Sequence, residues 1–171
     1  NNKRKRFIRE FEEKWYELWG HPTRPLDGLL SDCIILANLE NCFRSGVDYG
    51  DDVVFSVNLG DVDDLRRLLS VFNLGYGSNR VCYLNPLFGE SSTRIGGADA
   101  DIIIGDTLFD IKTTKYLQSK RDHFYQLLWY YLLNLREGDP YKIRSLGIYF
   151  SRFGVAYSFP VPGDVVRVRG N

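Results

Sequence analysis

The sequence predicts an α/β protein in which a central mixed sheet is flanked by helices, with extra helices at the N-terminus. Helical apolar periodicity fills the N-terminal part, short strand-like runs follow it, and one further helical segment separates two groups of those runs. With 171 residues, 44% of them hydrophobic, the chain is long enough for a single compact domain over residues 1–171. It begins at Asn1 and has no methionine, which is compatible with a trimmed chain or a piece of a longer protein.

The N-terminal part predicts three helices, over residues 7–18, 27–45 and 61–72, preceded by a basic arm at residues 1–6. Gly20 and Gly46 end the first two helices, and Asp61 is the expected cap of the third. Two prolines, Pro22 and Pro25, mark a turn after the first helix. The residues expected to face inward on the first and third helices are Phe7, Phe11, Trp15, Leu18, Val62, Leu65, Leu69 and Phe72.

The rest of the chain predicts strands around one further helix. The helix is expected over residues 120–135, and residues 85–97 form a connection rich in Pro, Gly and Ser. The expected strands are residues 81–84, 99–104, 107–112, 146–152 and 154–161.

Composition excludes several classes of protein. Lys plus Arg and Asp plus Glu number 22 each, so the chain lacks the overall basic excess of many nucleic-acid binders, although a local basic face is compatible with neutrality. The three cysteines are odd in number and show no CxxC spacing, which argues against a disulfide scaffold, a zinc ribbon or an iron–sulfur cluster and favours a reducing cytoplasm. No apolar run is long enough to span a bilayer and no signal peptide precedes the first helix, so we expect no membrane partner.

The stretch GGADADIIIGDTLFDIKTTK at residues 96–115 carries the most chemistry. If Gly105 and Asp106 form a two-residue type II′ turn, the register places Asp101 opposite Asp110. The same register places Asp99 opposite Lys112, and all four side chains then project from one face, because side chains alternate along a strand. The other face carries Ile102, Ile104, Phe109 and Ile111, which we expect to pack into the core.

Two carboxylates on directly opposed positions, with Cβ atoms about 5 Å apart, repel one another unless a cation lies between them or one is protonated. A hard divalent cation such as Mg²⁺, which prefers oxygen ligands, suits this arrangement. Two alternatives stay open: the charges serve solubility, with Asp99 and Lys112 as a weak surface ion pair, or a shifted register makes Asp99 rather than Asp101 the first ligand.

The hairpin resembles the PD-(D/E)XK nuclease superfamily, which includes restriction-type endonucleases and RecB-like exonucleases. The motif is an Asp followed by apolar residues and then (D/E)-x-K on the next strand, here Asp101 with three isoleucines and Asp110-Ile111-Lys112. The resemblance implies a restriction-endonuclease-like αβββαβ core. It also implies that Asp101, Asp110 and the Ile111 carbonyl bind Mg²⁺ or Mn²⁺, and that Lys112 orients the attacking water and stabilises charge on the phosphate.

Further residues are expected at the site by the same resemblance. RecB-like members often carry Q-x-x-x-Y on the following helix, and QLLWY places Gln126 and Tyr130 there, on one stripe with His123. For Gln126 a surface position is the alternative, whereas for Tyr130 and His123 core packing or capping is favoured over a role at the site. Many relatives add an acid from an earlier helix, for which Glu40 is the candidate; the alternative is that Glu40 is merely solvated.

The implied function is metal-dependent hydrolysis of phosphodiester bonds, with nucleic acid, and DNA above all, as the partner. The exposed candidates for contacting the nucleic-acid backbone are Lys115, Lys120 and Arg121, with Tyr130 beside them; a solvated loop is the alternative. A short domain of this type often grips a duplex as a homodimer or with a fused partner subunit. Two competing functions remain: a catalytically weak or silent nuclease-fold module for nucleic-acid binding or assembly, and a hydrolase of another phosphate ester.

Overall fold

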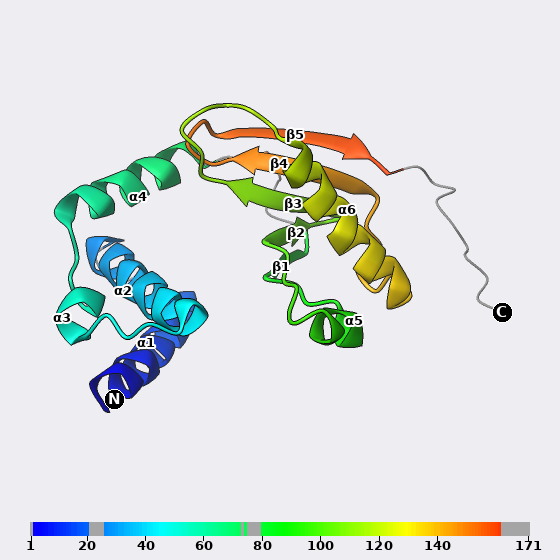
Figure 1. Ribbon diagram of the computed structural model, residues 1–171. Coiled ribbons are helices and arrows are strands. Elements are labelled where there is room, and N and C mark those ends of the chain that lie inside the picture. The colour runs from blue at the N-terminus through cyan, green and yellow to red at the C-terminus, as the bar shows by residue number, and fades with distance from the viewer. Residues whose placement is uncertain (1, 21–25, 73, 75–79, 162–171) are drawn as a thin grey trace. The chain divides into compact units, whose positions relative to one another are not determined.

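The computed structural model describes residues 2–20, 26–72, 74 and 80–161 (Figure 1). The chain divides after Ser70 into two compact units. The first consists of helices, and the second contains the sheet.

The first unit contains α1 (Asn2–Gly20), α2 (Leu26–Ser45), α3 (Asp51–Val54) and most of α4 (Leu59–Val71). The expected basic arm is wrong, because residues 2–6 belong to α1. Arg4 on this segment pairs with Asp48 at 2.6 Å and Asp51 at 2.8 Å. The expectations for Pro22, Pro25 and the side chains of Trp15 and Leu18 lie outside the described residues.

The start of α4 differs from the prediction. Asn58, not Asp61, provides the capping group: its side-chain oxygen accepts a hydrogen bond from the Gly60 N–H at 2.8 Å. Val62 is buried as expected, whereas Leu69 is half exposed. The short helix α3 was not predicted, since four residues are too few for a periodic pattern.

The second unit is built on one five-stranded mixed sheet. The strands are β1 (Cys82–Leu84), β2 (Ile102–Ile104), β3 (Thr107–Lys112), β4 (Ser145–Phe150) and β5 (Val155–Pro160), in that spatial order. Neighbouring strands are antiparallel except β3 and β4, which are parallel. A parallel pair needs a crossover, and α6 (Arg121–Arg136) provides it. The predicted α/β class with a mixed sheet and flanking helices is therefore confirmed.

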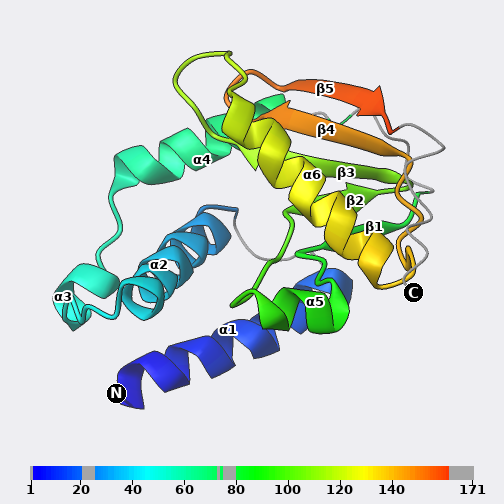
Figure 2. The same ribbon diagram turned by 45° about the vertical axis from the view of Figure 1, so that its right-hand side comes forward.

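Helix α6 lies across one face of the sheet, over β3 and β4 (Figures 1 and 2). Its Leu127 and Tyr131 pack into a buried cluster with side chains of β2, β3 and β4 and the loops beside them. The other face carries the smaller cluster of Ile102, Ile104, Phe109 and Tyr149, against which Ile111 packs. The apolar face predicted for the hairpin is thus confirmed.

One detail of the second unit was unexpected. The segment 85–97, predicted to be an irregular connection, contains the helix α5 (Gly89–Arg94). Cys82, like Cys33 and Cys42 of the first unit, is not in a disulfide. Among the described helices, none combines the length and the apolar character needed to cross a membrane.

Candidate active site

The hairpin β2–β3 has the predicted register. The strand partners are Ile102 with Phe109, Ile103 with Leu108 and Ile104 with Thr107. Gly105 and Asp106 are therefore the two turn residues. Gly105 has a φ of 63° and Asp106 does not have a positive φ, which is the combination that a type II′ turn requires.

Asp101 lies just beyond the end of the β2 ladder and reaches β3 with its side chain. Its Oδ2 accepts a hydrogen bond from the backbone N–H of Ile111 at 2.6 Å, while its carbonyl accepts one from Asn85 at 3.1 Å. The carboxylate of Asp101 therefore sits beside the residue that follows Asp110. Asp101 therefore lies close to Asp110, as predicted. The Asp101 side chain makes this contact, because the ladder of backbone hydrogen bonds between β2 and β3 does not extend to Asp101.

Asp99 does not take the predicted place opposite Lys112. It forms an isolated antiparallel bridge with Leu87 and is exposed. The backbone at Asp99 pairs with the segment after β1, so Asp99 does not pair with β3. This arrangement supports neither a surface ion pair between Asp99 and Lys112 nor the use of Asp99 as the first metal ligand.

Asp110 is almost completely buried, with a relative exposure of 1%. Lys112 Nζ donates a hydrogen bond to Asp110 Oδ1 at 2.9 Å and lies 2.8 Å from Oδ2. Oδ2 is nevertheless a buried oxygen that accepts no well-oriented hydrogen bond from any described residue. A buried charged atom without such a partner is costly, so a role in solubility does not account for this side chain.

Burial raises the pKa of the Asp110 carboxyl above its ordinary value, and the nearby charge of Asp101 acts in the same direction. The hydrogen bond and charge of Lys112 oppose this rise, but the pKa still lies above the ordinary value. A divalent cation at this carboxylate would add a second positive charge beside Lys112 and favour the ionised form.

A side chain of helix α6 holds Lys112 in position. Lys112 Nζ also donates to Gln126 Oε1 at 3.0 Å, and Gln126 Nε2 donates to the Tyr130 hydroxyl at 2.9 Å. Tyr130 is partly buried and stacks on Phe88 with ring centroids 5.8 Å apart. Gln126 is therefore partly buried against Lys112 rather than on the open surface. Tyr130 holds Gln126 from the core side, and its contact with nucleic acid stays a prediction.

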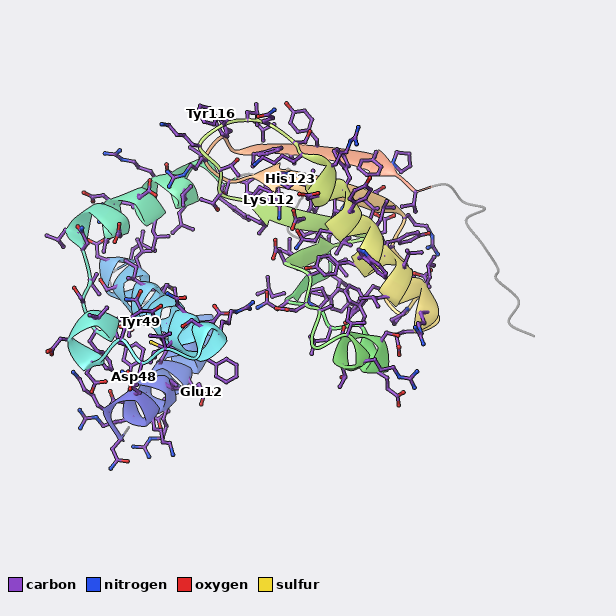
Figure 3. The ribbon with its side chains drawn as sticks, viewed as in Figure 1. Glu12, Asp48, Tyr49, Lys112, Tyr116 and His123 are labelled. Atoms are coloured by element: carbon purple, nitrogen blue, oxygen red, sulfur yellow. The ribbon has the colours of Figure 1, made fainter. Side chains whose placement is uncertain are left out.

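His123, at the start of α6, is buried and near Lys112 (Figure 3). Its Nδ1 accepts a hydrogen bond from the Lys120 backbone N–H at 3.3 Å, as a capping residue does. Burial lowers the pKa of His123, and the positive charge of Lys112 lowers it further. A neutral imidazole is required for Nδ1 to accept this hydrogen bond.

The loop between β3 and α6 carries the expected basic side chains. Lys115, Lys120 and Arg121 are all exposed, and Lys115 Nζ lies 5.6 Å from the ring centroid of the exposed Tyr116. Figure 3 shows Tyr116 on this loop, in the same region as Lys112. The positions of these residues suit contact with a polyanion beside Asp110.

Glu40 lies on α2 in the first unit, is exposed, and pairs with Arg44 one helical turn away at 2.7 Å. The alternative that Glu40 is solvated is therefore confirmed, and its role as an added acid of the site stays a prediction.

Two contacts that sequence reasoning missed fix the end of β3. The Lys112 carbonyl accepts a hydrogen bond from the Ser151 N–H at 3.1 Å, and the hydroxyls of Thr113 and Ser151 lie 2.8 Å apart. Ser151 follows β4, and its approach depends on the parallel pairing of β3 with β4. No local pattern in the sequence signals that pairing.

The donor set fits a hard cation that keeps much of its water shell. The described residues contain no group of three or more His, Cys, Asp or Glu side chains arranged to hold a metal. Mg²⁺ is commonly bound by only one or two carboxylates together with waters and substrate phosphates. The buried carboxylate of Asp110 and that of Asp101 beside it meet that requirement.

Comparison of the chain with models of protein families, with curated proteins and with solved structures gives no match.

Proposed function

We propose that this chain is a Mg²⁺- or Mn²⁺-dependent nuclease of the PD-(D/E)XK type that hydrolyses phosphodiester bonds, with DNA as the expected substrate. The observation that supports this most strongly is the buried carboxylate of Asp110, which is paired with Lys112 at 2.8 Å and lies beside a second acid, Asp101. A second support is the element order, in which three antiparallel strands, a helix and a parallel strand match the αβββαβ core of the superfamily.

In this proposal Asp110 and Asp101 hold the cation, with the Ile111 carbonyl as a further oxygen. The bound metal would lower the pKa of a water molecule and stabilise charge that develops on the phosphate. Lys112 presents its ammonium group at the same place, where it stabilises the pentacovalent phosphate and the attacking oxygen. Gln126 restricts the lysine to this position through its 3.0 Å hydrogen bond, and Tyr130 restricts the glutamine.

The test is cleavage of linear and circular DNA, and of RNA, with Mg²⁺, with Mn²⁺ and with EDTA. We expect metal-dependent cleavage by the wild type and a loss of about a hundredfold or more in Asp110→Asn and Lys112→Met, as for removal of one transition-state contact. The matched control is Asp106→Asn, which changes an exposed carboxylate in the turn of the same hairpin. Cleavage of the circular substrate would identify an endonuclease.

Two results would contradict the proposal. Equal cleavage by wild type and Asp110→Asn would assign the activity to another site or to a contaminant. Absence of cleavage of every DNA and RNA substrate, in a protein that still binds them, would favour the silent nuclease-fold module.

A further inference from the structure

A pocket opens on the α6 side of the sheet, next to the candidate active site. Its volume is about 250 Å³. The floor is formed by the buried side chains of Ile148 and Phe150 on β4, and the walls include Phe124 of α6 and Phe159 of β5. Leu117 and Ser119 contribute from the loop that joins β3 to α6.

The sheet register places this pocket one strand away from the charged residues. Ile148 is the partner of Asp110 in the parallel pair β3–β4, and Phe150 is the partner of Lys112. Adjacent strands lie about 4.8 Å apart, and partnered residues project from the same face. A ligand that places a phosphate at Asp110 and Lys112 therefore brings its neighbouring group to the pocket.

The pocket has the character of a site for a flat aromatic group. The rings of Phe124 and Phe159 are 5.9 Å apart at their centroids, and those of Phe150 and Tyr157 are 6.2 Å apart. Tyr157, also a lining residue, is 56% exposed and thus accessible at the rim. Ser119 adds a hydroxyl that can pair with the polar edge of a base.

We infer that the substrate is a single-stranded or locally unpaired nucleic acid and that this pocket stacks one unpaired base adjacent to the scissile phosphate. The position of that phosphate rests on the proposed function. A base inside a duplex is already stacked on both sides and cannot enter, whereas an unpaired base exposes its π-face to aromatic side chains. The basic side chains of Lys115, Lys120 and Arg121 on the adjoining loop complement the backbone charge of such a strand.

The experiment measures binding, so that it does not depend on cleavage. Full-length Asp110→Asn protein is titrated, by fluorescence anisotropy, against a labelled 12-residue single strand and against copies with one abasic nucleotide at each successive position. We expect one abasic position to weaken binding about tenfold, the order of a single base–aromatic stack. The same strand in a perfect duplex is expected to bind more weakly.

A second substitution in the same protein then tests the pocket itself. Tyr157→Ala is expected to weaken binding of the intact strand about tenfold and to remove the effect of the abasic position. Ser119→Trp, at an exposed loop position, fills the pocket from outside and is expected to do the same. Trp129→Ala is the control, because this exposed α6 aromatic does not line the pocket, and it should leave both affinities unchanged.

The inference is overturned if no abasic position stands out, if duplex binds as tightly as the single strand, if no strand binds, or if Tyr157→Ala and Trp129→Ala have equal effects. Parallel titrations with DNA and RNA strands identify which nucleic acid supplies the base. The two proposals can fail separately. If the wild type cleaves no substrate but the effect of the abasic position on binding still disappears in Tyr157→Ala, the nuclease proposal is contradicted and the base pocket is supported.

Discussion

At the scale of single residues, Asp110 is the side chain whose environment is hardest to explain by stability alone. It is buried, its Oδ2 accepts no well-oriented hydrogen bond among the described residues although Lys112 Nζ lies 2.8 Å away, and a second acid lies beside the next residue. Leaving a buried polar atom unpaired costs about 1–3 kcal/mol, and more when it is charged. Lys112 offsets part of this cost but is itself shared with Gln126.

The raised pKa of Asp110 predicts how its contribution to stability changes with pH. In the unfolded chain the carboxyl loses its proton near its ordinary value of 3.8, whereas in the folded protein it keeps the proton to higher pH. Between these two pKa values the folded state binds more protons, so stability falls as pH rises. In EDTA, the free energy of unfolding of wild type minus that of Asp110→Asn should therefore fall from about pH 4 upward.

Urea unfolding of the two proteins at successive pH values measures this difference, and the titration of groups that do not interact with Asp110 cancels in the subtraction. A difference that rises with pH would mean that Lys112 stabilises the ionised carboxylate by more than burial destabilises it. Addition of Mg²⁺ should raise the free energy of unfolding of the wild type and leave that of Asp110→Asn unchanged.

At the scale of elements, the hairpin β2–β3 could be predicted because its determinants are local. A glycine with positive φ at the turn fixed the register, and alternation along the strands then placed Ile102, Phe109 and Ile111 on one apolar face. The departure of Asp99 from β3 could not be predicted, because it depends on pairing with the segment after β1. Helix α5 was missed since its sequence, GESSTR, has no apolar periodicity.

The sheet beneath the site depends on Gly147, in the middle of β4. A Cβ at this position would lie 2.5 Å from the Phe109 ring and 2.9 Å from the Tyr157 carbonyl, so both strands beside β4 would have to shift. We expect Gly147→Ala to lower the free energy of unfolding by about 2 kcal/mol, as overpacking in a close-packed core does. Chemical denaturation is the measurement.

The control for this substitution is Ser158→Ala. Ser158 is the exposed β5 residue paired with Gly147, and its change should cost less than about 0.5 kcal/mol. If Gly147→Ala proved as stable as this control, the close approach of Phe109 to β4 would not be a feature of the folded protein.

At the scale of the whole molecule, the chain consists of two compact units, and the residues grouped around Asp110 all belong to the second. Most helices of the first unit could be predicted from the sequence. Whether an acidic residue of that unit belongs to the site could not be predicted. Helical spacing placed Glu40 near an apolar stripe, whereas the solvent-facing pairing with Arg44 depends on the rotation of α2 against its neighbours. Periodicity alone determines that rotation only approximately.

The exposed position of Glu40 and its ion pair with Arg44 predict that Glu40 is dispensable for catalysis. Glu40→Gln removes one surface ion pair, with an expected effect on stability below about 1 kcal/mol, and should change the cleavage rate less than about twofold. Steady-state cleavage by Glu40→Gln, compared with Arg44→Gln as the matched partner, measures this. A loss of about a hundredfold in Glu40→Gln alone would show that the first unit contributes a carboxylate to the reaction.

The central claim is that Asp110 Oδ2 is a ligand position for a divalent cation, and calorimetric titration with Mn²⁺ tests it most directly. The expected result is one site per chain in the wild type and in Asp99→Asn, and no measurable site in Asp110→Asn or Asp101→Asn. Binding of Mn²⁺ by Asp110→Asn with wild-type affinity, or its absence from the wild type, would contradict the claim.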